Sequence, residues 1–540
     1  MSVLVLLLRQ RLRRDWRQLL MWIGGTGALA AASVSGVSQS FRTPADQSNL
    51  LITVLANPII LVFRGLPSGP GDAAVALFLI LPFLALMAGF MSSFLAVRHT
   101  RAEEESGRAE LVAAAGAGRF APFVATVAHG ILANLALAAV IAATFIGLGF
   151  GAEGSILSAA ATGVVGVSAL GVGLLAAELM PSSRAANSFA VWLLMAMYLL
   201  AGIGNAAGVA DVERLRIESA LPAWLSPFGW AEQSRPFADN EWWPLLLPTA
   251  LAVVVILAAT IVRARRDAGS SLFAERTGRA DAGNMLSGVF GLAWRLNRAA
   301  IVGWAFGGLV TGALATKLAS VIRDTATDNP TLERILQAIT AHTDLQSAAV
   351  VVFFTMLGVL ASAAAVQVIA KARQEEAHGT TELLWTSPVS RVRWLGASLT
   401  VAGIAIVGTC AAALFGATLG LASQSNPSWA VLRDAAIVSA GEAVAAAVFA
   451  TLTALVLVLL PRLTIGLGWG LVMAGMLVGL FGPLFGLDRA IVDLAPIASV
   501  ATIDGDAIDW QNTGLFAGVV TVGVLLALAL VRRREHQPSI

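Results

Sequence analysis

Long apolar runs, almost free of charged residues, dominate this chain of 540 residues. A helix needs about 20 mostly apolar residues to cross the hydrocarbon core of a membrane. Twelve runs reach or approach that length: 19–41, 73–97, 120–152, 155–177, 185–210, 242–262, 299–316, 345–370, 394–432, 435–460, 463–487 and 512–531. The runs are continuously apolar and do not alternate, so they predict helices and not the strands of a barrel. The expected fold is an all-α polytopic membrane protein with twelve transmembrane helices.

The composition excludes several other classes of protein. Hydrophobic residues make up 57% of the chain and charged residues only 13%, which suits a surface in lipid and not one in water. The net charge of +2 gives no indication of a nucleic-acid partner. One cysteine, Cys410, and five scattered histidines offer no ligand spacing, so no metal site is predicted. The expected location is the cell membrane, with lipids around the protein.

Basic residues predict the orientation of the spans. Five arginines lie between Arg9 and Arg17, before the first run, and the loops on the same side of the membrane hold most of the 35 basic residues. Cytoplasmic loops are enriched in Lys and Arg, so both termini are expected in the cytoplasm. The first run exceeds the ~7–15 apolar residues of a signal peptide, and more spans follow, so it is interpreted as a retained span.

Two predicted cytoplasmic loops contain an internal repeat. Segments 101–111 and 373–383 share the pattern R-x-E-E-x-x-G-x-x-E-L and lie 272 residues apart, about half the chain. Each copy follows the second span of its half, and an even number of spans separates them. This indicates two parallel, pseudo-symmetric six-span halves. The predicted domains are a first half, 1–265, a cytoplasmic linker and surface helix, 266–298, and a second half, 299–540.

Each copy of this motif is expected to form a short amphipathic helix at the membrane surface. Glu103, Gly107 and Glu110 fall at positions i, i+4 and i+7, on one helix face, and the second copy repeats this arrangement. The acidic groups would face the cytosol, and the glycine would leave room for another surface. A solvated loop is the simpler alternative, but it does not require the same pattern twice.

The second copy, ELLWTSPVSR from Glu382 to Arg391, resembles the first cytoplasmic loop of ABC-transporter permeases of the drug- and polysaccharide-exporter class. In that class this loop is the coupling helix, which docks into the ATPase subunit. The resemblance therefore implies a coupling role for Glu103, Glu104, Gly107, Glu110, Arg119, Glu375, Glu376, Gly379, Glu382 and Arg391. The first copy departs from the pattern, with Gly116 in place of the proline that stands at Pro388 in the second. Segments 4–17 and 287–298 resemble the elbow helices of the class.

The whole chain resembles a fused twelve-span form of this class, the actinobacterial permeases described as exporters of polyketide antibiotics (tetronasin-type multidrug efflux). Matching pieces lie in 225–230, 266–276 and 290–298. The resemblance implies a membrane subunit that moves hydrophobic compounds, such as antibiotics and other drugs, out of the cell. A phosphate-binding loop needs a glycine before its lysine, whereas Thr316 precedes Lys317 and Ala370 precedes Lys371. We therefore expect no enzymatic activity and no cofactor in this chain, and ATP and Mg²⁺ in two copies of a separate ATPase subunit.

A few ionisable residues fall within or beside the predicted spans, where they are costly and often functional. Glu442 lies inside the tenth span and is expected either to act on substrate or gating or to form a polar pair in the bundle. Glu178 and Lys317 lie near span ends, where a long side chain can reach the interface. His129, in the third span, is expected to be a packed polar residue.

The substrate cavity is predicted from the resemblance, because the second and fifth spans of each half line it in that class. Methionine suits a surface that must accept varied shapes. The candidate cavity residues are Phe90, Met91, Phe94, Met195, Met197, Phe353, Phe354, Met356, Met473 and Met476.

Other functions stay open at this point. An ion-gradient-driven secondary multidrug transporter would need carboxylates or broken helices near the midplane, and Glu442 stands nearly alone there. An ABC exporter of a lipid or cell-envelope precursor would share the architecture. A membrane-bound enzyme would need clustered His, Asp or Glu, and the sequence shows no such cluster.

Overall fold

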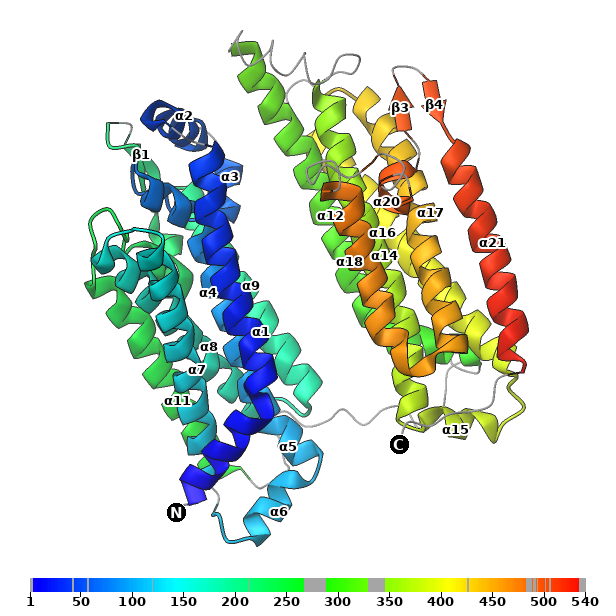
Figure 1. Cartoon of the computed structure of the whole chain (residues 1–540), viewed down its shortest axis with the longest axis horizontal. Helices are drawn as coiled ribbons and strands as arrows, with labels where there is room; N and C mark the ends of the chain where they lie inside the picture. Colours follow the sequence, from blue (N-terminus) through cyan, green and yellow to red (C-terminus); the bar gives the residue numbers. More distant parts are fainter. Residues whose placement is uncertain are drawn as a thin grey trace. The chain divides into compact units, whose positions relative to one another are not determined.

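Figure 1 shows the computed structural model of the chain. The structure describes residues 3–40, 43–55, 58–118, 120–211, 213–266, 288–328, 345–424, 427–481, 488, 492, 494–500, 502–504 and 507–533. The chain divides into two compact units, Met1–Thr277 and Gly278–Ile540, here called unit 1 and unit 2. Each unit is a bundle of long helices.

The elements follow one another in a similar order in the two units. Unit 1 contains α1 (Val3–Ser40), α2 (Pro44–Leu55), α3 (Pro58–Phe63), α4 (Asp72–Arg98), α5 (Arg101–Glu105), α6 (Arg108–Ala114), α7 (Ala121–Gly147), α8 (Ala152–Leu179), α9 (Ser183–Ala206), β1 (Val209–Asp211), β2 (Arg216–Glu218), η1 (Leu221–Leu225), α10 (Pro227–Glu232), η2 (Trp243–Leu245) and α11 (Leu246–Arg265). Unit 2 contains α12 (Val289–Asp328), α14 (Leu345–Ala377), α15 (Thr380–Trp385), α16 (Arg391–Ala422), α17 (Ala430–Leu459), η4 (Pro461–Leu463), α18 (Thr464–Phe481), α20 (Pro496–Ser499), β3 (Thr502–Asp504), β4 (Ala507–Asp509) and α21 (Gln511–Val531).

Eleven helical segments among the described residues are long and apolar enough to cross a membrane. They are Asp72–Glu105, Ala121–Gly147, Ala152–Leu179, Ser183–Ala206, Trp243–Arg265, Val289–Lys317, Phe353–Ala377, Arg391–Ala422, Ala430–Leu459, Pro461–Gly479 and Gln511–Val531. The prediction of an all-α polytopic membrane protein is therefore confirmed. The first predicted span, 19–41, falls on α1, which is not one of the eleven. Twelve spans, cytoplasmic termini and the symmetry of the halves stay predictions.

One pair of helices forms the centre of each unit. In unit 1, α4 packs against α8, and 78% of the most apolar window of each is buried inside the protein. In unit 2, α14 packs against α17, with 67% and 61% of these windows buried. By contrast, only 17% of the corresponding windows of α18 and α21 is buried. The second and fourth predicted spans of each half are thus central, which explains why these helices are apolar on all sides.

Small residues lie in the most extensive helix–helix contact of unit 2, between α12 and α16. Gly308 and Gly312 of α12 and Gly416 and Gly420 of α16 form the small-xxx-small pattern that lets backbones approach within a membrane. A Cβ atom at Gly312 would lie 1.8 Å from the carbonyl oxygen of Ala413, and one at Gly416 would lie 1.9 Å from that of Leu309. Only glycine fits at these two positions.

A short antiparallel hairpin lies at one end of each unit. β1 pairs with β2 in unit 1, with Ala210 opposite Ile217, and β3 pairs with β4 in unit 2, with Ile503 opposite Ile508. In Figure 1, α5 and α6 lie at the end of unit 1 away from β1, and α15 lies at the end of unit 2 away from β3 and β4. The repeated motif therefore occupies the opposite end of each bundle from the hairpin.

Candidate functional site: the repeated loop motif

The central glycine of each motif ends one helix and begins the next. Gly107 separates α5 from α6 with a φ of 71°, and Gly379 separates α14 from α15 with a φ of 74°. These are left-handed backbone angles that glycine adopts without steric cost. The expectation that Glu103, Gly107 and Glu110 share one face of a single helix is therefore wrong. The same correction applies to Glu375, Gly379 and Glu382.

Each motif contains one buried ion pair. Arg101 pairs with Glu104 at 3.2 Å, and Arg373 pairs with Glu376 at the same distance. All four side chains are at most 9% exposed. The repeated R-x-x-E spacing therefore serves an internal contact that buries Glu104 and Glu376.

The other acids at the start of each motif are also engaged. Glu103 is 18% exposed and binds Arg14 at 3.3 Å and Arg11 at 3.6 Å. In the second copy, Glu375 binds Lys371 at 2.7 Å and accepts a hydrogen bond from the hydroxyl of Thr380 at 2.7 Å. The first half of each motif thus anchors the loop to its bundle.

The end of each motif is the part that projects from the surface. Glu110 and Glu382 are exposed. The leucine after each, Leu111 and Leu383, is 71% and 74% exposed. The same Glu-Leu pair is thus exposed twice, on two short helices of equivalent sequence. Both residues belong to the repeated pattern, although only the glutamates were predicted to be functional.

Of the two arginines that close the motif copies, Arg119 and Arg391, the structure describes only Arg391. Arg391 begins α16 directly after the N-cap residue Ser390, whose hydroxyl accepts a hydrogen bond from the backbone N–H of Arg393. Arg119 lies outside the described residues. Gly116, which replaces the proline of the second copy, has a φ of 78° and belongs to the turn after α6.

Three side chains far apart in sequence meet behind the first motif. Asp15 of α1 contacts Nε2 of His99, which follows α4, and lies 3.4 Å from Nε2 of His129 on α7. All three are nearly fully buried. Nδ1 of His99 lies 3.3 Å from Glu103, so the cluster continues into the motif. The sequence gives no sign of this cluster, since Asp15 and His99 are 84 residues apart.

The donor types of this cluster would suit a divalent transition metal, but its charges do not favour one. Arg98 lies 3.1 Å from Asp15, and the buried Arg11 lies on the other side of Glu103. Burial disfavours the charged form of Asp15, but the two imidazoles and the Arg98 guanidinium hold the pKa of its carboxyl below its usual range. The cluster is best described as a polar junction that joins α1 to α4 and α7.

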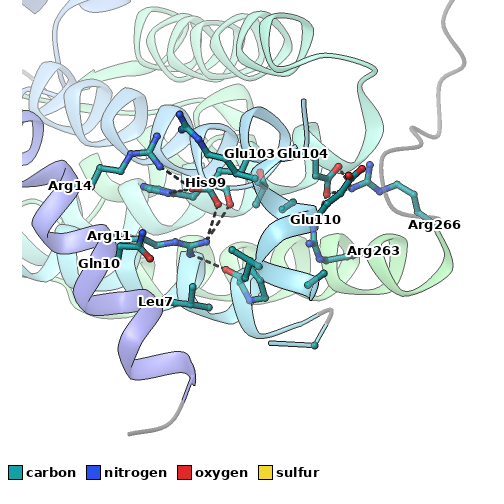
Figure 2. A pocket seen from close by; sticks show the side chains of 17 residues that line it. Leu7, Gln10, Arg11, Arg14, His99, Glu103, Glu104, Glu110, Arg263 and Arg266 are labelled. Carbon is teal, nitrogen blue, oxygen red and sulfur yellow. Dashed lines mark hydrogen bonds and ion pairs between the residues drawn. The ribbon is translucent and has the colours of Figure 1, made fainter. Parts of the chain in front are cut away.

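A pocket of about 450 Å³ lies beside this junction in unit 1. Its walls come from the first turns of α1, the α5–α6 loop, the start of α7 and the end of α11. Figure 2 shows Arg11 and Arg14 on one side, Arg263 and Arg266 on the other, and Glu103 and Glu104 between them. Unit 2 has a pocket of about 240 Å³ beside its own motif, lined by α12, α14, α15 and α16.

Comparison with known proteins identifies the family. Residues 286–532 match the C-terminal domain of the multidrug efflux system permease Rv1217c. The chain is also 31% identical to the multidrug efflux system permease protein Rv1217c of Mycobacterium tuberculosis (strain ATCC 25618 / H37Rv), over 92% of this chain and 89% of that protein. The chain belongs to this family of efflux permeases. The resemblance to ABC-type efflux permeases is thus confirmed, and the permease is a multi-pass integral protein of the cell membrane.

The permease pairs one of its intramembrane charges inside unit 1. Glu178, at the end of α8, is fully buried and binds Arg263 at 2.7 Å and Arg266 at 2.8 Å. The expectation that it reaches the membrane interface is therefore wrong, because α11 brings two guanidinium groups to it. Lys317 instead lies close to the surface and donates to the carbonyl oxygen of Ser423 at 3.3 Å.

Glu442 of the permease is 1% exposed on α17. Its Oε2 atom has no hydrogen-bond partner among the described residues. It lies against Gly358 of α14, where a Cβ atom would come within 1.8 Å of this oxygen. The structure thus places a carboxyl group in the centre of unit 2, and its functional role stays a prediction.

The ten predicted cavity residues of the permease fall in different environments. Met91 and Phe354 are buried at 3% and 0% exposure, and Met356 and Met473 are 44% and 49% exposed. The remaining six, Phe90, Phe94, Met195, Met197, Phe353 and Met476, are partly buried. The two pockets beside the motifs are lined by other residues, so the cavity assignment stays a prediction.

Proposed function

We propose that this permease is the membrane subunit of an ATP-driven exporter of hydrophobic compounds, such as antibiotics and other drugs. The name of its mycobacterial relative, a multidrug efflux system permease protein, supports the substrate class and the direction. ATP and Mg²⁺ would bind in a separate ATPase subunit present in two copies. The permease would have twelve spans, with α1 as the first and both termini in the cytoplasm.

The two ATPase copies would dock on the exposed ends of the motifs, and this pair of surfaces is the observation that carries the proposal. Each offers one acidic and one apolar side chain: Glu110 with Leu111, and Glu382 with Leu383. Interfaces are stabilised mainly by a few anchoring side chains, and polar neighbours orient them. A repeated surface of this kind suits two identical partners.

The buried ion pairs would transmit movement from the docking surface to the bundle. The Arg101–Glu104 pair also reaches α11, because Glu104 binds Arg266 at 2.7 Å, and α8, because Arg266 binds Glu178. A push on the first motif would thus reach two long helices of unit 1, α8 and α11. We propose that closure of the ATPase dimer on ATP switches the cavity from inward-facing to outward-facing through these contacts.

The test is co-purification of the permease with its candidate ATPase, followed by substrate-stimulated ATP hydrolysis. The variants Glu110→Ala with Glu382→Ala, and Leu111→Ala with Leu383→Ala, should each weaken association about tenfold or more. Leu463→Ala, which removes another exposed leucine (52% exposed), is the matched control and should change neither measurement. Unchanged association and coupling in both double variants would contradict the docking role.

The buried carboxyl of Glu442 favours one alternative, a secondary transporter driven by an ion gradient. Drug efflux from proteoliposomes distinguishes the two. An ATP-driven exporter needs the ATPase and ATP and tolerates collapse of the proton gradient. Efflux that follows the proton gradient without an ATPase, and that Glu442→Gln abolishes, would overturn the proposed class.

A further inference from the structure

The pocket of unit 1 combines arginines with an apolar wall. Five arginines line it against three glutamates, so its lining is positively charged. Arg11, Arg263 and Arg266 lie deep, with side chains at most 12% exposed, and are held by Glu103, Glu104 and Glu178. Leu7, Val112 and Pro122 supply apolar surface beside them.

Two arginines of the lining are accessible to a ligand. Arg14 is 38% exposed at its side chain and shares Glu103 with the buried Arg11. Arg108, at the start of α6, is exposed and makes no ion pair with a described residue. The pocket therefore has more guanidinium groups than its own carboxylates neutralise, which is the condition for binding an external anion.

The pocket of unit 2 shows that these arginines are not needed to build the motif. Its lining residues Val289, Leu292, Ala293 and Leu296 stand 282 residues after Leu7, Gln10, Arg11 and Arg14, and Thr380 stands 272 residues after Arg108. Every arginine at these positions is replaced by an uncharged residue. The basic residue of the unit 2 lining, Lys371, is paired with Glu375 at 2.7 Å. Two pockets of related sequence thus differ in chemistry, and only the pocket of unit 1 suits an anion.

The first turns of α1 indicate where that anion comes from. The face of α1 that points away from the pocket exposes Val5, Leu12 and Trp16 by 47%, 40% and 54%. Arg9 and Arg13 lie on this same face. An amphipathic helix with aromatic, aliphatic and basic side chains on its exposed face lies in the plane of the headgroups. The pocket on its other side is then at headgroup depth.

We propose that the pocket of unit 1 binds the phosphate-bearing headgroup of one anionic phospholipid of the cytoplasmic leaflet. The guanidinium groups of Arg14 and Arg108 bind the phosphate, and Leu7, Val112 and Pro122 contact the adjoining apolar part of the lipid. Basic pockets between membrane helices on the cytoplasmic side bind such headgroups. The lipid would lie between α1 and α6 and so support the loop that carries the first motif.

The test uses the full-length permease in detergent, titrated with phosphatidylglycerol or phosphatidylcholine, with thermal unfolding and the number of retained lipids in native mass spectra as readouts. We expect saturable stabilisation by phosphatidylglycerol alone. Arg14→Gln with Arg108→Gln should raise the half-saturating concentration roughly tenfold to thirtyfold, because each arginine contributes about a fivefold effect. The control, Arg9→Gln with Arg13→Gln, removes the same charge from the opposite face of α1 and should change it less than twofold.

Separate results would overturn the proposal. An equal rise of the half-saturating lipid concentration in the two double variants would mean that overall surface charge, and not the pocket, attracts the lipid. Displacement of the lipid by millimolar inorganic phosphate would mean a site for the free anion. Unchanged lipid retention with loss of ATPase binding would mean a protein-docking pocket. If the double variant unfolds without lipid, Arg108→Gln alone carries the test, since Arg108 is exposed and unpaired among described residues.

Discussion

At the scale of single residues, several buried charges at the end of unit 1 that holds the motif have partners from distant helices. Glu178 binds Arg263 of α11 and Arg266, which directly follows this helix, and Glu104 binds the same pair. Burying an ion in a low-dielectric interior costs several kcal/mol, so each such group needs a partner that the fold supplies. These contacts fix α8, α11 and the first motif to one another.

Replacing Glu178 by Gln should destabilise the permease by about 3 kcal/mol, because two buried guanidinium groups would lose a charged partner. The measurement is thermal unfolding of the purified protein in detergent. Glu153→Gln, at an exposed position in the first turn of the same helix, is the control and should leave the transition in place. Equal unfolding temperatures for both variants would show that the buried pair contributes nothing.

Glu232 gives the stability of the outer segment of unit 1 a pH dependence. It lies between the spans α9 and α11, where burial raises its pKa to about 8, although a hydrogen bond from Asn205 at 2.6 Å acts in the opposite direction. The folded state therefore binds a proton that the unfolded state, with a pKa near 4.5, releases. The contribution of Glu232 to the free energy of unfolding is therefore fully present below pH about 4.5. It is lost as the pH rises through about 8, by up to about 1.4 kcal/mol per pH unit.

The variant Glu232→Gln should flatten this profile, because glutamine keeps the acceptor for Asn205 and cannot ionise. Unfolding temperatures of the purified permease between pH 5 and 9 provide the measurement, with the exposed Glu241→Gln as the control. A parallel decline in wild type and Glu232→Gln would assign the pH dependence to another group.

At the scale of elements, helix pairing in unit 2 depends on glycine spacing. α12 and α16 approach until backbone carbonyl groups occupy the places where side chains would stand. Neighbouring glycines of the same helix differ in their surroundings. A Cβ atom at Gly307 would meet nothing within 4 Å, whereas one at Gly308 would lie 2.4 Å from the carbonyl oxygen of Thr409. A larger side chain therefore has room at Gly307 but not at Gly308.

Gly308→Leu should separate α12 from α16 and lower the yield of folded permease several-fold, because neither backbone can move without breaking the contact. Gly307→Leu, one residue away, should be tolerated, since it adds apolar surface towards open space. The readout is monodisperse protein after size-exclusion chromatography. Similar losses in both variants would contradict this packing.

At the scale of the whole molecule, the duplicated motif predicts the composition of the exporter. One permease chain of 55.8 kDa should bind two ATPase subunits, because each unit carries one docking surface. Native mass spectrometry of the purified complex measures this directly. A complex with two permease chains for two ATPase subunits would contradict it, and the Leu463→Ala control should retain the wild-type composition.

The proposed orientation can be tested in intact cells by labelling introduced cysteines. The native Cys410 is buried and should stay unlabelled. Val209→Cys, in the hairpin of unit 1, should react with a membrane-impermeant maleimide, whereas Thr386→Cys, after the second motif, should react only after the membrane is opened. The reverse labelling pattern would place the motifs outside the cell, where the ATPase could not reach them, and would contradict the proposed orientation.

Residue patterns that are local in sequence were predictable. The length and apolar character of the runs predicted a helical membrane protein, since a span must satisfy its backbone hydrogen bonds within itself. The repeat located both motifs. The helix break at Gly107 could not be predicted from the repeat. An i, i+4, i+7 spacing assumes a continuous helix, whereas the left-handed backbone angle of Gly107 ends one helix and begins another.

The sequence by itself thus determined the class of fold, the repeat and the family resemblance, all of which follow from length, composition and local spacing. The tertiary structure alone decided which parts of the motif are buried, that Asp15, His99 and His129 meet, and that Glu178 faces two arginines. It also decided that five arginines line the pocket of unit 1, whereas the pocket of unit 2 has one lysine, paired with a glutamate. Helices that are apolar on all sides carry no signal for their rotation or their neighbours. Partners from separate helices are therefore set by packing and cannot be inferred from spacing along the chain.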